Sequence, residues 1–364
     1  MRYDAAIVGA GAAGSMAAYL LSKKGYRVIV LEKNRAVGEK VCGGLVSERV
    51  IRLSNTEAVT NEIRGADVFF PDGRCVRIGG DKTHAYVIDR NAFDREIAEK
   101  AMAEGAIYRM ETKAVHISEH RITGSADISF DVLIGADGAQ SAVAHRFSMG
   151  NVEYINTIQG EARTFGEDRF VRIYLDTRFS PGFFSWCIPD GEKTRVGLGS
   201  IERGLRQKLD AFAAMISVDV KHAKGALIPI GMRKFWKENV VLLGDAAGQV
   251  KATSGGGLYP LLLAAHLLSE HFDDFEQYRR EFMQRFGQEL KRALLARRIF
   301  VRLSNDDFNY LAGHIAEEVE LITRYGDIDY QSEVAQAFIK KHPSLIWYIL
   351  RKMAGQSFFS MCSL

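Results

Sequence analysis

The feature that most constrains this chain is a glycine fingerprint near its N-terminus. The segment YDAAIVGAGAAGSMAAYLLSKKGYRVIVLEK carries Gly9, Gly11 and Gly14 between an apolar strand and an alanine-rich helix, and a second apolar strand ends at Glu32. This order is typical of a dinucleotide-binding βαβ unit. Its glycines permit a tight turn, close approach of a pyrophosphate and close packing of helix on strand. The sequence therefore predicts a Rossmann-like domain with phosphates at the helix N-terminus.

Glu32 limits which dinucleotide this unit would bind. A carboxylate at the end of the second strand accepts hydrogen bonds from ribose hydroxyls and repels a 2′-phosphate. FAD or NAD therefore fits better than NADP. An ordinary βαβ unit with a chance glycine pattern is the alternative, and the position of the acidic residue argues against it.

Two later strand–loop–helix segments favour FAD over NAD. FDVLIGADGAQSAVAHRF places Asp137 and Gly138 after a buried strand, and VVLLGDAAGQVKATSGGGLYPLLLAAHLL places Asp245 and the glycines at 255–257 after another. An aspartate at a strand end can accept hydrogen bonds from the ribityl hydroxyls of FAD. A glycine loop before a helix can present N–H groups to the flavin edge. An NAD dehydrogenase needs neither feature.

Composition excludes several other classes of protein. The chain has 364 residues and a net charge of +3, a balance too even to suggest nucleic-acid binding. Its four cysteines show no paired spacing, so we expect no metal site, no disulfide framework and a cytoplasmic, reducing location. No signal peptide is visible, and no apolar run is long enough to span a bilayer.

Taken together, these motifs resemble the FAD-dependent oxidoreductases of the p-hydroxybenzoate hydroxylase type over about residues 1–270. That family carries GxGxxG with a strand-end Glu, then an Arg–x3–Asp helix, then Asp-Gly, then Gly-Asp, and all four occur here in order. Arg90 and Asp94 supply the second pattern. Within this group, the KVCGG segment and the GDAAGQVKATSGGG tract resemble archaeal geranylgeranyl and digeranylgeranylglycerophospholipid reductases.

The resemblance implies a set of FAD-binding residues. In it, Arg90 lies beside the FAD phosphates or adenosine, the backbone of Ala114 meets the adenine from the strand after the Arg90 helix, and the Cys-Gly-Gly tract lies along the flavin ring. The full set is Gly9, Gly11, Ala13, Gly14, Glu32, Cys42, Gly43, Gly44, Arg90, Ala114, Asp137, Gly138, Asp245, Gly256, Gly257 and Leu258.

A second set of residues is expected at the substrate. In PGFFSWCIPDGEKTRVGLG, strand alternation puts Phe184, Trp186 and Ile188 on one face and Ser185 and Cys187 on the other. Geranylgeranyl reductases line their lipid tunnel with an aromatic–x–Trp–x–Phe–Pro run followed by Gly-x-Gly, and flavin halogenases have a similar Trp-x-Trp-x-Ile-Pro run. An ordinary sheet core is the alternative. The implied substrate-binding residues are Phe184, Trp186, Ile188, Pro189, Gly197 and Gly199.

Reduction of an isolated C=C bond needs a hydride on one carbon and a proton on the other. Cys42 and Tyr259 are the candidate catalytic residues because each could donate that proton, and a trapped water is a further source. Cys42 could instead only pack on the flavin as a small apolar residue.

The predicted architecture is α/β (α+β overall), a Rossmann-like FAD-binding domain with an inserted antiparallel β-sheet substrate domain and a helical C-terminal extension. Residues 66–78 read as a hairpin, and residues 274–303 as an amphipathic helix whose basic face could rest on anionic lipid or simply be solvated. The expected division is 1–65, 90–150 and 236–272 for FAD, 66–89 and 151–235 for the substrate sheet, and 273–364 for the helical region.

The sequence thus predicts an FAD-dependent reductase of geranylgeranyl chains, on archaeal-type ether phospholipids. We expect an external electron donor, ferredoxin or NAD(P)H, and a peripheral position at the inner face of the membrane. Three alternatives stay open: a flavin monooxygenase or halogenase acting on an aromatic, a quinone side-chain reductase, and a flavin electron carrier or lipid-binding protein without turnover.

Overall fold

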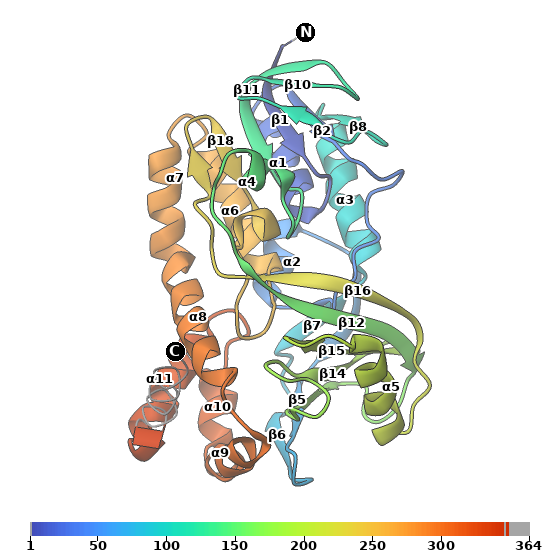
Figure 1. Ribbon diagram of the computed structural model, residues 1–364, viewed down its shortest axis with the longest axis vertical. Coiled ribbons are helices and arrows are strands. Elements are labelled where there is room, and N and C mark those ends of the chain that lie inside the picture. Colours follow the sequence, from blue (N-terminus) through green and yellow to red (C-terminus); the bar gives the residue numbers. More distant parts are fainter. Residues whose placement is uncertain (1, 346, 349–364) are drawn as a thin grey trace, which may run out of the picture. The chain divides into compact units, whose positions relative to one another are not determined.

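The computed structural model describes residues 2–345, 347 and 348, and the chain divides into two compact units. The first unit comprises Met1–Thr60, Ile88–Tyr154 and Leu227–Leu290, and the second comprises Asn61–Val87, Ile155–Ala226 and Lys291–Leu364 (Figure 1). Three short strands lie within residues 45–88, the part of the chain that passes from the first unit to the second and back. They are β3 (Leu45–Val46), β4 (Val59–Ile63) and β7 (Ala85–Ile88).

The first unit is built on a mainly parallel sheet in the order β17-β18-β11-β1-β2-β8. Strand β2 and the C-terminal halves of β1 and β11 are apolar and buried, because parallel strands are covered on both faces. A hairpin of β9 and β10 pairs with β11, and β17 is antiparallel to β18. The bounds are β1 (Arg2–Val8), β2 (Val28–Leu31), β8 (Ile107–Arg109), β9 (His116–Ile117), β10 (Arg121–Thr123), β11 (Ile128–Gly135), β17 (Trp236–Lys237) and β18 (Val240–Leu242).

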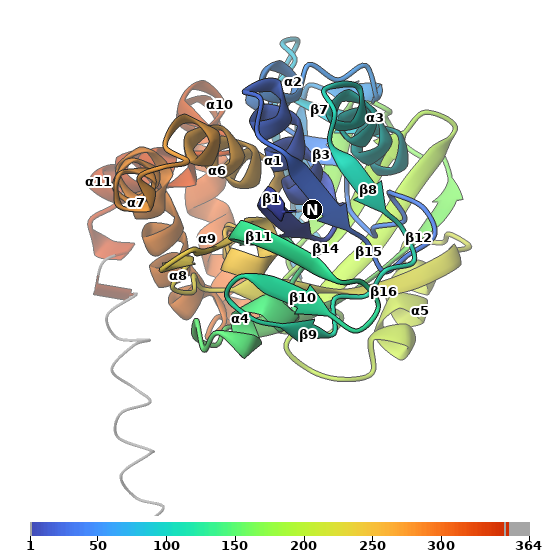
Figure 2. The same ribbon diagram turned by 90° about the horizontal axis from the view of Figure 1, so that it is seen from above.

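Helix α1 (Ala12–Lys23) packs against both α3 (Arg90–Ala103) and α6 (Leu258–Glu270), which is possible because its buried residues are mostly small (Figure 2). The unit also contains α2 (Glu48–Ser54), α4 (Ala142–Arg146), the 3₁₀ turn η1 (Gly244–Ala247) and α7 (Phe275–Phe282). The predicted Rossmann-like domain is confirmed.

The second unit is built on a seven-stranded sheet in the order β16-β12-β15-β14-β13-β5-β6. The predicted hairpin at residues 66–78 is confirmed as β5 and β6, and the predicted antiparallel sheet contains one parallel pair, β13 with β5. The bounds are β5 (Gly65–Phe69), β6 (Cys75–Gly79), β12 (Glu153–Arg163), β13 (Phe170–Tyr174), β14 (Ser185–Asp190), β15 (Lys193–Ser200) and β16 (Lys221–Ile230).

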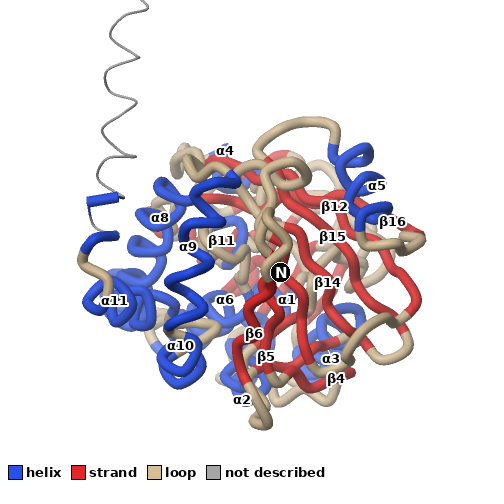
Figure 3. Tube along the Cα trace, turned by 90° about the horizontal axis from the view of Figure 1, so that it is seen from below, coloured by secondary structure: helices blue, strands red, loops and turns tan. Residues whose placement is uncertain are grey.

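Helices cover this sheet from two sides. Helix α5 (Leu205–Met215) packs on the face that carries Cys187, through Phe212. On the opposite face of β5 and β6, α9 (Asn305–Glu317) packs through Phe308 and Ala312 (Figure 3). Helices α10 (Val319–Tyr325) and α11 (Gln331–Lys341) complete the described part of the unit.

The amphipathic helix expected at residues 274–303 forms as α7, a π-helical turn η2 (Met283–Gly287) and α8 (Gln288–Phe300). The expected boundaries differ from the observed units. Residues 227–235 fall in the first unit, although 227–230 still belong to β16 of the seven-stranded sheet, and residues 273–364 are divided at 290/291 rather than forming a region of their own. The end of the helical region predicted from sequence, residues 346 and 349–364, lies outside the described residues.

Gly197 provides a test of packing in the second unit. A Cβ at this position would lie 2.6 Å from Cζ2 of Trp186 and 2.8 Å from the carbonyl oxygen of Ile158. We expect Gly197→Ala to lower the free energy of unfolding by about 1–3 kcal/mol, because a closely packed sheet accommodates an added methyl poorly. Urea denaturation followed by tryptophan fluorescence measures this change.

Gly80→Ala is the matched control, since a Cβ at Gly80 would meet no atom within 4 Å. This substitution should leave the stability unchanged or raise it by about 0.4–1 kcal/mol, because alanine lowers the conformational entropy of the unfolded chain. Equal stability of the two variants would contradict the packing argument.

Candidate active site

Each of the three fingerprint glycines is required for a different structural reason. A Cβ at Gly9, whose φ is +102°, would lie 2.4 Å from the carbonyl oxygen of Ala136, and a Cβ at Gly14 would lie 1.9 Å from the carbonyl oxygen of Gly9. Both positions are closed by backbone. A Cβ at Gly11 would meet no atom within 4 Å. Gly11 therefore leaves open space at the N-terminus of α1, which fits a cofactor phosphate approaching the backbone.

Glu32 joins the loops at this edge of the sheet. Its carboxylate is buried and accepts hydrogen bonds from the backbone N–H of Ala10 at 2.8 Å and of Asn34 at 2.9 Å. Each carboxylate oxygen can accept a further hydrogen bond, so a ribose hydroxyl can still bind there. Glu32 thus lies beside the glycine turn, and its role at a ribose stays a prediction.

The two aspartates predicted near the flavin behave differently. Asp137 accepts hydrogen bonds from the Ser141 hydroxyl at 2.5 Å and from the N–H of Ala142 at 2.7 Å, so it caps the start of α4. Burial raises the pKa of Asp137, against these hydrogen bonds. Asp245 instead pairs with the Lys40 ammonium at 2.6 Å. Its other oxygen lies 3.5 Å from where a Cβ of Gly257 would be, so Asp245 faces the glycine loop.

The glycine loop before α6 is shaped by a buried lysine. The side chain of Lys251 is 4% exposed, and a Cβ at Gly256 would lie 2.7 Å from its Cε. The Ser254 hydroxyl is buried and makes no hydrogen bond within the part of the chain that the structure describes. A buried hydroxyl without a partner beside a loop of glycines fits a site that a polar ligand completes. Leu258 begins α6 directly after this loop.

Cys42 lies in a turn that positions its sulfur near positive charge. Gly44, whose φ is +71°, donates its N–H to the Cys42 sulfur at 3.3 Å. Burial by itself would raise the pKa of the thiol, but the Arg90 charge, the Gly44 N–H, a hydrogen bond from Arg90 and the Lys40 charge together hold that pKa below its ordinary value. Lys40 thus links Cys42 with Asp245, because it pairs with Asp245 and lowers the pKa of Cys42.

Arg90 is itself fixed by Asp94. The two side chains are 8% and 1% exposed and are joined at 2.9 Å, one helical turn apart on α3. The Arg–x3–Asp pattern is therefore a buried ion pair, and Arg90 also donates a hydrogen bond to Cys42.

The remaining predicted residues are placed as follows. Ala13 lies on α1, with its Cβ 3.1 Å from where a Cβ of Gly244 would be. Tyr259 is buried on α6, with its ring 5.2 Å from the Phe286 ring and 5.8 Å from the Arg49 guanidinium. Neither contact tests Tyr259 as a proton donor, which stays a prediction.

One predicted placement is wrong in its secondary structure. Ala114 was expected on the strand after the Arg90 helix, but that strand, β8, ends at Arg109, and Ala114 lies in the following loop. The chain turns there because Glu111 adopts a φ of +50° and Thr112 donates its N–H to the carbonyl oxygen of Glu32 at 2.7 Å.

The substrate-side residues belong to the second unit. Trp186 and Ile188 lie on the face of β14 opposite Cys187, as the alternation predicts, and the indole N–H of Trp186 donates to Gln159 Oε1 at 2.9 Å. Gly197 makes room for the ring of Trp186 on the neighbouring strand, and Gly199 makes room for the ring of Phe183, which precedes that strand. The Phe184 ring lies 5.9 Å from the Trp186 ring. Pro189 lies on β14, buried.

Sequence reasoning missed the roles of Lys40 and Lys251. A lysine inside a tract of small residues directly before three glycines was a usable signal for Lys251. No local signal pointed to Lys40, since its partner Asp245 is far away in the sequence.

The charges around Cys42 predict its reactivity. Cys42 should react with iodoacetamide faster than Cys75 at neutral pH, although Cys75 is the more exposed, because burial and Asp67 raise the pKa of Cys75. The rate at Cys42 should rise with pH and reach half its plateau below the ordinary thiol pKa of about 8.5. Peptide mass mapping of labelled protein over a pH series measures both rates.

Lys40→Met should move the midpoint for Cys42 to higher pH, because a positive charge near the thiolate is lost. Lys33→Met, which changes an exposed lysine of the same segment, should leave it in place. Slower labelling of Cys42 than of Cys75 throughout the series would contradict the arrangement.

Comparison with known proteins supports the same assignment. Residues 7–70 match the NAD(P)-binding Rossmann-like domain family. Geranylgeranyl diphosphate reductase of Rhodobacter capsulatus is 31% identical over 71% of this chain and 72% of its own length. Digeranylgeranylglycerophospholipid reductase of Methanocaldococcus jannaschii is 27% identical over 95% of this chain and 97% of its own.

A solved structure has the same fold over almost the whole chain. It is described as a geranylgeranyl bacteriochlorophyll reductase-like protein from Thermoplasma acidophilum. Its TM-score is 0.80 at 21% identity, and the match covers 96% of this chain and 99% of that one. With the glycine fingerprint, the strand-end glutamate and the Cys-Gly-Gly turn in place, the chain belongs to the geranylgeranyl reductase family of FAD-dependent oxidoreductases.

Proposed function

We propose that this protein saturates C=C bonds of geranylgeranyl chains, on archaeal-type ether phospholipids. One observation carries the proposal beyond the family likeness. Lys40 pairs with Asp245, which faces the glycine loop, and Lys40 also lowers the pKa of Cys42. One lysine side chain therefore links the candidate proton donor with the expected flavin-binding loop.

The residues of the first unit suit FAD. Gly11 and the start of α1 would receive the phosphates, Glu32 a ribose, and Asp245 with the loop before α6 the ribityl chain and flavin edge. Bound reduced FAD supplies a hydride to one alkene carbon. Ala13, Gly138 and the backbone around Ala114 complete the proposed cofactor site.

The role of Cys42 would be to hold the proton for the second alkene carbon. A donor with a depressed pKa gives up its proton more readily, and Arg90 and Lys40 would stabilise the thiolate that remains. Cys42 is partly exposed, so the thiolate can be protonated again from solvent. Tyr259 is the alternative donor on α6.

The substrate side would be supplied by the second unit. The hydrogen bond from Trp186 to Gln159 satisfies the polar atom of the indole and leaves an apolar ring surface beside Phe184 and Ile188. We propose that this surface, with Pro189 and the flat strand at Gly197 and Gly199, accommodates the prenyl chain. The electron donor would be external, ferredoxin or NAD(P)H, since the sequence carries one dinucleotide fingerprint.

An anaerobic turnover experiment tests this proposal. The yellow holoprotein is reduced with dithionite, a geranylgeranylated glycerophospholipid is added, and the lipid mass and flavin absorbance are followed. We expect gains of two hydrogens per step together with flavin reoxidation. Replacing dithionite by NADPH, NADH or reduced ferredoxin identifies the donor. Flavin that stays reduced until oxygen is admitted, beside unchanged lipid, would favour the monooxygenase alternative.

Variants in the same assay assign the proton. We expect Cys42→Ala to keep bound FAD and to lose about 10²–10⁴-fold in turnover, the usual contribution of a general acid. Cys75→Ser, which changes an exposed thiol of the second unit, should be unaffected. Full turnover in Cys42→Ala would mean that Cys42 only packs, and Tyr259→Phe would be examined next.

Contact with a membrane surface is proposed separately. Among the described residues, no helix is both long and apolar enough to cross a membrane. The segment from α7 to α8 exposes six basic side chains, of which Arg279 pairs with Glu276 and Arg285 with Glu281. The exposed basic residues are Arg279, Arg280, Arg285, Lys291, Arg292 and Arg298. Two of the six are therefore neutralised locally.

We expect the protein to sediment with vesicles containing anionic lipid and to be released by salt, because surface attraction is screened. Changing Lys291, Arg292 and Arg298 together to Glu should abolish sedimentation, whereas changing Arg279 and Arg285 to Gln should have a smaller effect. Equal binding to neutral vesicles would contradict an electrostatic surface.

A further inference from the structure

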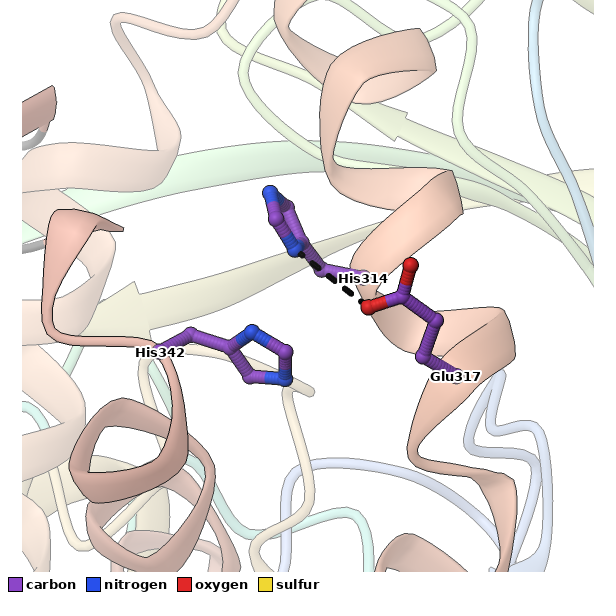
Figure 4. A group of neighbouring side chains, drawn as sticks. All are labelled: His314, Glu317 and His342. Carbon is purple, nitrogen blue, oxygen red and sulfur yellow. Dashed lines mark ion pairs between the residues drawn. The ribbon is translucent and has the colours of Figure 1, made fainter.

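Two histidines and a glutamate that lie apart in the sequence meet in the second unit. His314 and Glu317 lie one helical turn apart on α9, and His342 follows the end of α11. One potential ligand atom from each of the three residues lies within 4.8 Å of those of the other two. Figure 4 shows the two imidazole rings and the carboxylate gathered around one point between α9 and the segment after α11.

One buried nitrogen of each ring lacks a hydrogen bond of good geometry. Nδ1 of His314 and Nε2 of His342 are both buried, and neither makes a hydrogen bond to the described residues. The closest carboxylate oxygens are Oε2 of Glu317, 3.9 Å from His314 Nδ1, and Oε1 of Glu318, 3.4 Å from His342 Nε2. Buried polar atoms normally have partners, so Nδ1 of His314, 3.9 Å from the nearest carboxylate oxygen, indicates a missing group, whereas Nε2 of His342 also lies against Glu318.

The surrounding rings fix the orientation of both histidines. The rings of His314 and His342 meet nearly edge-on at 4.8 Å. Tyr310 packs against His314 at 5.1 Å and Phe338 against His342 at 5.0 Å. The two nitrogens are thus held in place by packing rather than by hydrogen bonds, which is the support that a preformed ligand pair requires.

The spacing of the ligand atoms suits a small divalent ion. Bonds of about 2.0–2.2 Å from Zn²⁺ to nitrogen and oxygen separate the ligand atoms of a tetrahedral site by about 3.4 Å. The separations here are at most 4.8 Å, so binding an ion requires the Glu317 side chain, which is exposed, and the two rings to move together by about 1 Å or less. Two imidazoles and one carboxylate are ligands typical of Zn²⁺ and its neighbours among the divalent transition metals.

Glu317 is a better carboxylate ligand than Glu318. The Glu318 carboxylate pairs with the Lys341 ammonium at 2.7 Å, and this hydrogen bond, against burial, holds the pKa of Glu318 low. Glu318 is therefore already neutralised by charge, whereas Glu317 Oε2 has only His314 near it among the ion pairs of the described chain.

We propose that His314, Glu317 and His342 form a site for a divalent transition-metal ion of the Zn²⁺ type, with water as a further ligand. The ion would join α9 to the segment after α11 and so fix the end of the described helical region against the helix that packs on β5 and β6. The spacing of the cysteines predicts no metal site, but these three ligands include no cysteine. The proposal is independent of the reductase activity.

Binding of Co²⁺ to the full-length, chelator-treated protein tests the site, since Co²⁺ replaces Zn²⁺ and reports its coordination by visible absorption. We expect one equivalent of Co²⁺ to give a saturable visible spectrum that Zn²⁺ displaces. His314→Gln and His342→Gln should each abolish it, Glu317→Gln should weaken it, and Glu318→Gln should retain it. Zn²⁺ should also raise the melting temperature of the unchanged protein and not that of His314→Gln.

Two control variants locate the ion. His222→Asn changes an exposed histidine of the same unit and should bind Co²⁺ normally. His271→Gln disrupts a second group, Glu270, His271 and Glu281, in the first unit and should also bind normally. A spectrum that is lost in His271→Gln and kept in His314→Gln and His342→Gln would overturn the proposal. A protein that binds no Co²⁺ and gains no stability with Zn²⁺ would overturn it as well.

Discussion

The two hydrogen bonds that the Glu32 carboxylate accepts from the backbone hold the nucleotide-binding edge together. Ala10 follows β1 and Asn34 follows β2, so one side chain fixes the loops after two adjacent strands. The backbone of Glu32 extends this connection, because its N–H donates to Arg109 on β8 and its carbonyl accepts from Thr112. The ends of β1, β2 and β8 are therefore held together. The open space at Gly11 lies at the same edge of the sheet.

Charge pairing organises the rest of the first unit. Arg90 is buried with Asp94, and Lys40 is paired with Asp245, so each cation that lowers the pKa of Cys42 already has an anionic partner. Burying an unpaired charge is costly, whereas a paired cation can lie beside a thiol and still favour its thiolate. The electrostatic environment of Cys42 thus depends on residues from three separate segments of the chain.

The second unit has an apolar face on its sheet and, on its helical side, a cluster of two histidines and a glutamate. The Trp186 ring packs where a Cβ of Gly197 would lie, so the position requires glycine, and α9 covers the β5 and β6 end of the sheet. The same helix presents His314 and Glu317 away from that packing, towards His342. One helix therefore serves the core on one side and the proposed metal ligands on another.

Much of the first unit could be predicted from sequence because its signals are local. The spacing of Gly9, Gly11 and Gly14 between apolar strands, together with Glu32, sufficed for the fold, and strand alternation placed Trp186 opposite Cys187. Pairings between distant segments could not be predicted, because no periodicity relates Lys40 to Asp245 or His314 to His342. The close contact that excludes a side chain at Gly9 is likewise tertiary, since it comes from the carbonyl of Ala136, which follows β11 far along the chain.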